Sequence, residues 1–301
     1  MRITKMQSDQ LRIEDEHLVT VTDMGHLVEV QYVQNKNTKQ RIQKLDAHRY
    51  MVLSTGEVKE FQKSTDRSQL ANSLKKTMKR LRYLINNNFN GSKNELFTTL
   101  TYAENMTDTG RLYEDVKNFM KRLRYEYRDV STIDYINVVE PQSRGAWHCH
   151  LLLRFNDLEE VYVPNEKYAE LWGHGFVNVR RLENVDNIGA YLSAYLSDIP
   201  IDDIGQDEIL KIFEIGETMP VKTVKEKRYI KGGRLYMYPS GMNLYRASRG
   251  IRKPDRQDMS YLQAKERLGD ATKVYGSGYH LDDETSDYEN VVIYEEYNSK
   301  R

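Results

Sequence analysis

Two histidines one residue apart, His148 and His150, are the side chains of this chain best suited to chemistry. Side chains alternate across a β-strand, so both imidazoles point to one face of a predicted strand at 147–155. The opposite face of that strand is apolar and consists of Trp147, Cys149, Leu151, Leu153 and Phe155. Two neutral imidazoles on one strand face can bind a single divalent metal ion.

A carboxylate is predicted beside the two imidazoles. Residues 134–140 have the pattern of a partner strand and residues 141–145 have the composition of a turn, which places Glu140 nearly opposite His148. Three ligands with open positions suit a catalytic metal better than a closed structural one. The alternative interpretation is an incidental surface pair of histidines.

An amphipathic helix is predicted downstream, with its apolar stripe formed by Val185, Ile188, Leu192, Leu196 and Ile199. Tyr191 and Tyr195 lie four residues apart on one flank of this helix, and Tyr191 lies further from the stripe. A tyrosine hydroxyl, with an ordinary pKa of ~10, needs a base or a metal-polarised phosphate to act as a nucleophile. The chain contains 22 tyrosines, so such a pair alone could equally be structural.

Together these groups resemble the HUH endonucleases that initiate rolling-circle replication. The similarity is strongest to the replication-associated Rep proteins of Gram-positive bacterial elements, which are related to phage replication proteins, and it extends over about residues 65–255. It rests on three ordered stretches and two further ones, namely Phe97–Tyr102, Glu140–His150, Gly189–Tyr195, Trp172–Phe176 and Lys231–Leu235.

The resemblance implies a site-specific endonuclease and ligase for single-stranded DNA that nicks a replication origin through a 5′-phosphotyrosine. Glu140, His148 and His150 would bind Mg²⁺ or Mn²⁺. Tyr191 would make the first attack, and Tyr195 would either attack second or position Tyr191. The ester conserves the phosphodiester energy, so no nucleotide cofactor is expected, and the chain has no Walker A motif.

One departure from the family pattern concerns a lysine that many relatives place three residues after the nucleophilic tyrosine. Here Ala194 follows Tyr191 and Asp198 follows Tyr195 at that spacing. Asp198 falls beside Tyr191 on the helix, so it is a candidate for a fourth ligand or a proton acceptor. Ordinary solvation at a helix end is the alternative.

The fold class predicted is α+β, with an HUH or ferredoxin-like core in the order β-α-β-β-α-β, an antiparallel sheet, helices on one face, and the tyrosine helix after it. The expected strands are 97–102, 134–140, 147–155 and 176–182, and the expected helices are 111–128 and 165–172.

Four regions are expected along the chain. They are a β-rich N-terminal extension at 1–66, the endonuclease core at 67–200, an accessory segment at 201–255 and an acidic, flexible tail at 256–301. Within them the patterns predict hairpins at 18–34 and 50–61, a helix at 70–85, and a strand pair at 229–242 around Gly232 and Gly233.

Charge and cysteine content limit the partners and the compartment. The 45 basic and 45 acidic residues balance, but the basic ones gather in a few stretches. Candidate DNA contacts are Arg144, Arg154, Lys121, Arg124, Lys231 and Arg234. The single cysteine excludes an internal disulfide and predicts a reducing cytoplasm. No apolar run approaches the ~20 residues of a membrane span.

Three functions compete. The first is initiation of rolling-circle replication on single-stranded DNA or an origin hairpin, together with a separate helicase and polymerase from the host or the element. The second is the same chemistry in transposition or conjugative mobilisation. The third is a non-catalytic DNA-binding regulator, which would form no metal-dependent covalent adduct.

Overall fold

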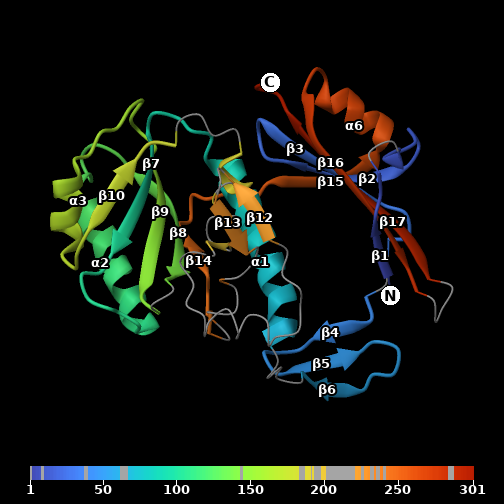
Figure 1. Ribbon diagram of the computed structural model, residues 1–301, viewed down its shortest axis with the longest axis horizontal. Coiled ribbons are helices and arrows are strands. Elements are labelled where there is room, and N and C mark those ends of the chain that lie inside the picture. Colours follow the sequence, from blue (N-terminus) through green and yellow to red (C-terminus); the bar gives the residue numbers. More distant parts are fainter. Residues whose placement is uncertain are drawn as a thin grey trace. The chain divides into compact units, whose positions relative to one another are not determined.

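Figure 1 shows the computed structural model of the chain, which divides into two compact units. One unit combines Met1–Gln69 with Asp255–Arg301, and the other is Leu70–Pro254. The residues described are 2–7, 10–36, 40–61, 67–142, 145–182, 187–190, 192, 198–200, 221–224, 227–230, 234, 238, 239, 242–283 and 288–301.

The unit Leu70–Pro254 is built on a five-stranded antiparallel sheet in the order β10-β7-β9-β8-β14. Its strands are β7 (Glu95–Thr101), β8 (Ile133–Pro141), β9 (Trp147–Phe155), β10 (Val177–Arg180) and β14 (Tyr245–Ala247). Helix α2 (Thr109–Glu126) joins β7 to β8, and α3 (Asn165–Trp172) joins β9 to β10. The predicted α+β class with an antiparallel sheet is therefore confirmed, and the element order is compatible with a ferredoxin-like core.

Local sequence explains these elements. Helix α2 buries Leu112, Val116, Phe119, Met120 and Leu123 at helical spacing, and the carboxylate of Asp108 caps it by accepting from the backbone N–H groups of Gly110 and Arg111. Strand β9 buries all five residues of its apolar face. The strand therefore holds the histidine face in place through the core behind it.

The two faces of the sheet carry different helices. Phe155 contacts Tyr127, which caps the C-terminus of α2, with ring centroids 5.0 Å apart. The neighbouring Arg154 points the other way and donates to the backbone carbonyl of Asn88, at the end of α1 (Arg67–Asn88), over 2.7 Å. Helix α1 thus contacts the face opposite to α2, so the expectation of helices on one face holds for the core pair α2 and α3 but not for α1.

Helix α1 also contacts the start of the predicted tyrosine helix. Residues 188–190 are helical, and a side chain on Gly189 would come within 2.5 Å of the Arg82 carbonyl. Asn86 accepts from the Gly189 backbone over 2.7 Å and donates to Asn187 over 3.0 Å. Glycine at position 189 therefore permits a close approach of the two helices.

The other unit corrects the expectation of a flexible tail at 256–301. Its sheet has the order β1-β16-β17-β3-β2-β15. The strands are β1 (Arg2–Lys5), β2 (Leu18–Asp23), β3 (Leu27–Val33), β15 (Asp255–Ser260), β16 (Thr272–Asp282) and β17 (Glu289–Asn298). Helix α6 (Tyr261–Leu268) begins with a capping box at Ser260 and buries Ala264 against this sheet. The acidic segment is thus folded because β17 pairs with β3 from the beginning of the chain.

Two small sheets complete the described elements. One contains β4 (Ile42–Lys44), β5 (Arg49–Val52) and β6 (Val58–Glu60), and the other has the order β11-β13-β12. Strand β13 (Lys227–Ile230) pairs with β12 (Val221–Val224) and β11 (Ile199–Pro200), so the expected strand pair is corrected: the partners precede β13. Gly232 and Gly233 lie outside the described residues. None of the described helices is long and apolar enough to cross a membrane.

Candidate metal centre

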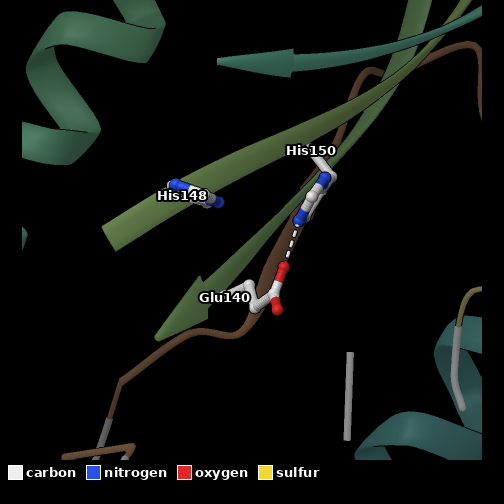
Figure 2. A group of neighbouring side chains, drawn as sticks. All are labelled: Glu140, His148 and His150. Atoms are coloured by element: carbon white, nitrogen blue, oxygen red, sulfur yellow. Dashed lines mark hydrogen bonds and ion pairs between the residues drawn. The ribbon is translucent and has the colours of Figure 1, made fainter. Parts of the chain in front are cut away.

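The register of β8 and β9 brings the three predicted metal ligands together. Glu140 lies directly opposite His148, and Val138 lies opposite His150. The potential ligand atoms of Glu140, His148 and His150 all lie within 4.8 Å of one another. Figure 2 shows the Glu140 carboxylate directed at His150, with His148 beside them.

The turn between the strands sets this register. The backbone N–H of Gln142 donates to Ala146 over 2.8 Å, and that of Gly145 donates to Gln142 over 2.9 Å. Gly145 has φ of 84°, a left-handed conformation that side chains rarely adopt. A short turn with glycine at this position therefore aligns the carboxylate with the histidines.

His150 is held rigidly at the centre of the site. One ring nitrogen, Nε2, is hydrogen-bonded to Glu140, and the other, Nδ1, lies 3.1 Å from the Thr99 hydroxyl on β7. Its ring stacks on Phe97 with centroids 5.4 Å apart. His150 and Glu140 are almost fully buried, whereas His148 is half-buried. The site is therefore closed on the sheet side and more accessible at His148.

Burial determines the charge state of His150. Loss of solvation, with a smaller contribution from the Arg180 guanidinium, lowers the pKa of His150 to about 3. The imidazole is therefore neutral near pH 7, which is the form that coordinates a metal. A buried carboxylate beside two imidazoles is a donor set that suits a divalent transition metal.

Arg234 contacts the same carboxylate from a distant part of the chain. Its guanidinium forms an ion pair with Glu140, donates to the Pro141 carbonyl over 3.3 Å and donates to the Asp198 carbonyl over 2.9 Å. Burial lowers the pKa of Arg234, but a guanidinium remains charged at neutral pH. Arg234 thus links Glu140 to Asp198, the residue just after the predicted tyrosine helix.

The structure leaves part of the predicted site outside the described residues. These are Tyr191 and Tyr195, together with the candidate DNA contacts Arg144 and Lys231. The neighbouring Ile188 and Leu192 are buried, as the predicted apolar stripe requires. Asp198 is buried as well, and its contact with Arg234 is made by the backbone carbonyl.

The remaining candidate DNA contacts do not gather at the histidines. Arg154 lies on the histidine face but at the far end of β9, where it pairs with Asp134 over 3.1 Å. Lys121 and Arg124 lie on α2, which covers the opposite face, and both are exposed. Arg124 donates to the Ile133 carbonyl and stacks over Tyr135. Only Arg234, of the described candidates, touches the metal ligands.

Sequence reasoning missed the residues on β7 and β10 that support His150. Thr99 pairs across the sheet with His150, and Arg180 lies 4.7 Å from the centre of the Phe97 ring. Alternation along β7 places Phe97 and Thr99 on one face, which is a signal the sequence carries. Their contact with His150 depends on the pairing of β7 with β9, which the sequence alone does not give.

Comparison with known proteins supports a role in replication. A sequence model of the family described as Replication-associated protein ORF2 matches residues 95–199, which include β7 and all three candidate ligands. The match covers 105 of the 301 residues. No curated protein and no solved structure matches the chain. This stretch is therefore similar to a family of replication-associated proteins.

Proposed function

We propose that this protein is a metal-dependent HUH endonuclease and strand transferase that nicks single-stranded DNA to initiate rolling-circle replication. The observation that carries the proposal is the convergence of Glu140, His148 and His150, within a stretch that matches a replication-associated family. A separate helicase and polymerase would then extend the nicked strand. The protein would act in the cytoplasm, where its buried single thiol stays reduced.

Glu140, His148 and His150 would hold the metal, and their mixed oxygen and nitrogen donors favour Mn²⁺ over Mg²⁺. When bound, such an ion polarises the phosphate and stabilises its developing negative charge. Thr99 fixes the ring of His150, and Arg234 fixes the carboxylate of Glu140. These contacts orient the ligands before DNA binds, which lowers the cost of assembling the site.

Tyr191 would supply the nucleophile. Its hydroxyl oxygen forms a bond to the scissile phosphorus, the bond from phosphorus to the 3′ oxygen breaks, and a proton moves from the tyrosine to that leaving oxygen. The products are a 5′-phosphotyrosine and a free 3′ hydroxyl. A later attack by a 3′ hydroxyl reverses these bonds and reseals the strand without ATP.

The test is formation of a covalent protein–DNA adduct. Single-stranded oligonucleotides that tile the DNA around the gene are incubated with the protein and Mn²⁺, and denaturing gels detect an adduct that chelator prevents. DNA binding that persists in chelator without any adduct would instead indicate a non-catalytic regulator.

Tyrosine substitutions then identify the nucleophile. Tyr191→Phe should abolish the adduct, because it removes one oxygen and little volume. Tyr195→Phe, the matched variant, should still form the adduct and fail, if at all, in strand transfer. Mass spectrometry of the peptide that carries the nucleotide checks the assignment, and an adduct found only on Tyr195 would reverse it.

A further inference from the structure

Two adjoining cavities lie at the end of the sheet away from the histidines. They have volumes of about 660 and 500 Å³, and both are lined by Asp134, Asn156, Arg249 and Gly250. Five arginines from different elements also line one cavity or the other, and we call this the arginine pocket: Arg124, Arg128, Arg154, Arg249 and Arg252. All of these residues belong to the unit Leu70–Pro254.

The charge of the arginine pocket is strongly positive. Among the described residues Asp134 is the one carboxylate in its lining, and Arg154 already neutralises it across 3.1 Å. Arg124 and Arg128 are exposed and come from the C-terminal end of α2. Converging guanidinium groups beside an open cavity favour a ligand with several negative charges.

Arg249 and Arg252 have guanidinium groups available for such a ligand. Both side chains are exposed, and neither guanidinium has a hydrogen-bond or ion-pair partner within the part of the chain that the structure describes. By contrast Arg154 is committed to Asp134 and to the Asn88 carbonyl. The first two arginines therefore offer the pocket's binding capacity, and Arg154 serves its framework.

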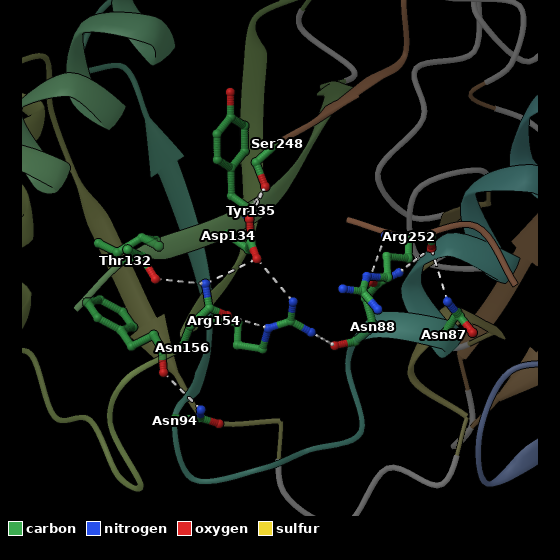
Figure 3. A network of polar contacts seen from close by, with 12 residues as sticks. Asn87, Asn88, Asn94, Thr132, Asp134, Tyr135, Arg154, Asn156, Ser248 and Arg252 are labelled. Atoms are coloured by element: carbon green, nitrogen blue, oxygen red, sulfur yellow. Dashed lines mark hydrogen bonds and ion pairs between the residues drawn. The ribbon is translucent and has the colours of Figure 1, made fainter. Parts of the chain in front are cut away.

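The loop that carries these arginines is anchored at both ends, as Figure 3 shows. The Ser248 hydroxyl donates to Asp134 over 2.7 Å, and the Arg252 backbone N–H donates to Asn88 over 3.0 Å. Gly250 lies so close to Asp134 that a side-chain carbon there would come within 2.2 Å of its carboxylate. A loop fixed in this way loses little conformational freedom when a ligand binds.

The pocket has a defined relation to the metal centre. Asp134 and Glu140 lie on the same strand, β8, and each is paired with a residue of β9 on the same face. Six residues separate them, which corresponds to roughly 20 Å along a strand. Neighbouring phosphates along one DNA strand are ~3.4 Å apart along a duplex axis, so this distance corresponds to roughly six nucleotides.

We propose that the arginine pocket is a second DNA-binding site, which binds backbone phosphates flanking the strand held at Glu140, His148 and His150. The choice of DNA as the polyanion rests on the proposed function. Arginine suits this role because its planar fork donates two hydrogen bonds to one phosphate. The pocket contributes affinity and placement of DNA, and it takes no part in the bond exchange.

Salt-dependent binding tests the proposal with the double variant Arg249→Gln/Arg252→Gln. The probes are a fluorescent 30-nucleotide oligothymidine and a 30-base-pair duplex, with anisotropy measured in chelator at several salt concentrations. Loss of two phosphate contacts should weaken binding about tenfold at low salt. It should also reduce the slope of log K against log salt by about 1.8 for duplex or about 1.4 for single strands.

The matched control, Arg12→Gln/Lys59→Gln, removes two positive charges from exposed side chains of the other unit that pair with Glu14 and Glu57. It should leave both slopes close to those of the unaltered protein. A loss confined to the duplex or to the single strand would identify which DNA occupies the pocket. Slopes of the double variant equal to those of the control would overturn the proposal.

Adduct formation by the unaltered protein is measured separately on the same preparation. Its absence would remove the proposed nuclease function, whereas the anisotropy comparison would still decide whether the arginine pocket binds DNA. The two proposals therefore fail in different measurements.

Discussion

Strands β8 and β9 present two carboxylates on one face, and their surroundings differ. Asp134 lies opposite Arg154, and Glu140 lies opposite His148. Asp134 accepts hydrogen bonds from Ser248, Asn156 and Arg154. Glu140 instead faces the neutral imidazole of His150 and a guanidinium from residue 234.

The difference shows how one strand pair separates stability from chemistry. A carboxylate surrounded by fixed donors completes a structural network and has little capacity for another cation. A buried carboxylate beside two neutral imidazoles has donor atoms that a metal ion can use. Substitutions at the two ends should therefore affect different measurements.

The largest effect is expected at the metal end. His148→Ala should lower metal-dependent nicking roughly 1,000-fold, since loss of a ligand removes several kcal/mol of transition-state stabilisation. The apolar face of β9 remains intact, so the circular dichroism spectrum and the melting temperature should change little.

A matched control for that variant is His280→Ala, which removes a strand histidine of the other unit that contacts Glu289. Its nicking should equal that of the unaltered protein. Metal-dependent nicking retained by His148→Ala would show that His148 is not a ligand.

The next effect is a loss of stability at the Asp134 end. Asp134→Ala should reduce the free energy of unfolding by about 2 kcal/mol, because Arg154 and Ser248 lose their shared partner. Asp134→Asn, which keeps the shape of the side chain, should cost less. Urea unfolding measures both, and a loss of nicking without a loss of stability would contradict the division between the two ends.

The same carboxylate predicts a dependence on pH. Burial alone would raise the pKa of Asp134, but the hydrogen bonds from Ser248, Asn156 and Arg154 outweigh it, and the pKa is lowered. The stability it contributes is therefore present above the ordinary value of ~3.9 and is lost as the pH falls through the lowered value. The stability difference between the unaltered protein and Asp134→Asn should shrink accordingly in acid.

A smaller effect is expected at Arg234. Its guanidinium pairs with Glu140 and would compete with a metal ion for that carboxylate. Arg234→Gln should therefore tighten Mn²⁺ binding roughly tenfold, about 1.4 kcal/mol, in a calorimetric titration. Weaker Mn²⁺ binding by this variant would show instead that Arg234 mainly positions Glu140.

The sequence predicted the part of the site that depends on local pattern. Alternation placed His148 and His150 on one face, and a five-residue turn was short enough to fix Glu140 opposite His148. The ranges of α2, α3, β8 and β9 followed in the same way, because each has a clear apolar period.

The contacts that the sequence did not predict all depend on pairing across long separations. Thr99 reaches His150 only through the pairing of β7 with β9, and Arg234 reaches Glu140 from 94 positions further along the chain. The supposed tail pairs with β3, and β17 buries the polar residues Asn290, Glu295 and Asn298, which obscures its alternation. Composition therefore suggested a solvated segment where the structure has a strand.

The smallest effect is expected at Cys149, which lies between the two histidines but points to the apolar face. Its thiol is fully buried, and burial raises the pKa of Cys149 to about 12, so it remains a neutral packing group near pH 7. The Asn137 amide donates to the sulfur across 3.9 Å, and the thiol lies 3.9 Å from the His150 carbonyl. A serine hydroxyl can use the same two partners, so Cys149→Ser should lower the free energy of unfolding by only about 1 kcal/mol.

Cys149→Ser also separates the two faces of β9, because it alters the core without touching a predicted ligand. Nicking and Mn²⁺ affinity should equal those of the unaltered protein, measured at a temperature where both are folded. In the unaltered protein a thiol reagent should react with Cys149 only as urea unfolds the chain, which provides an independent measure of core opening. Fast labelling of the folded protein, or a loss of Mn²⁺ binding in Cys149→Ser, would show that the core face and the histidine face are not independent.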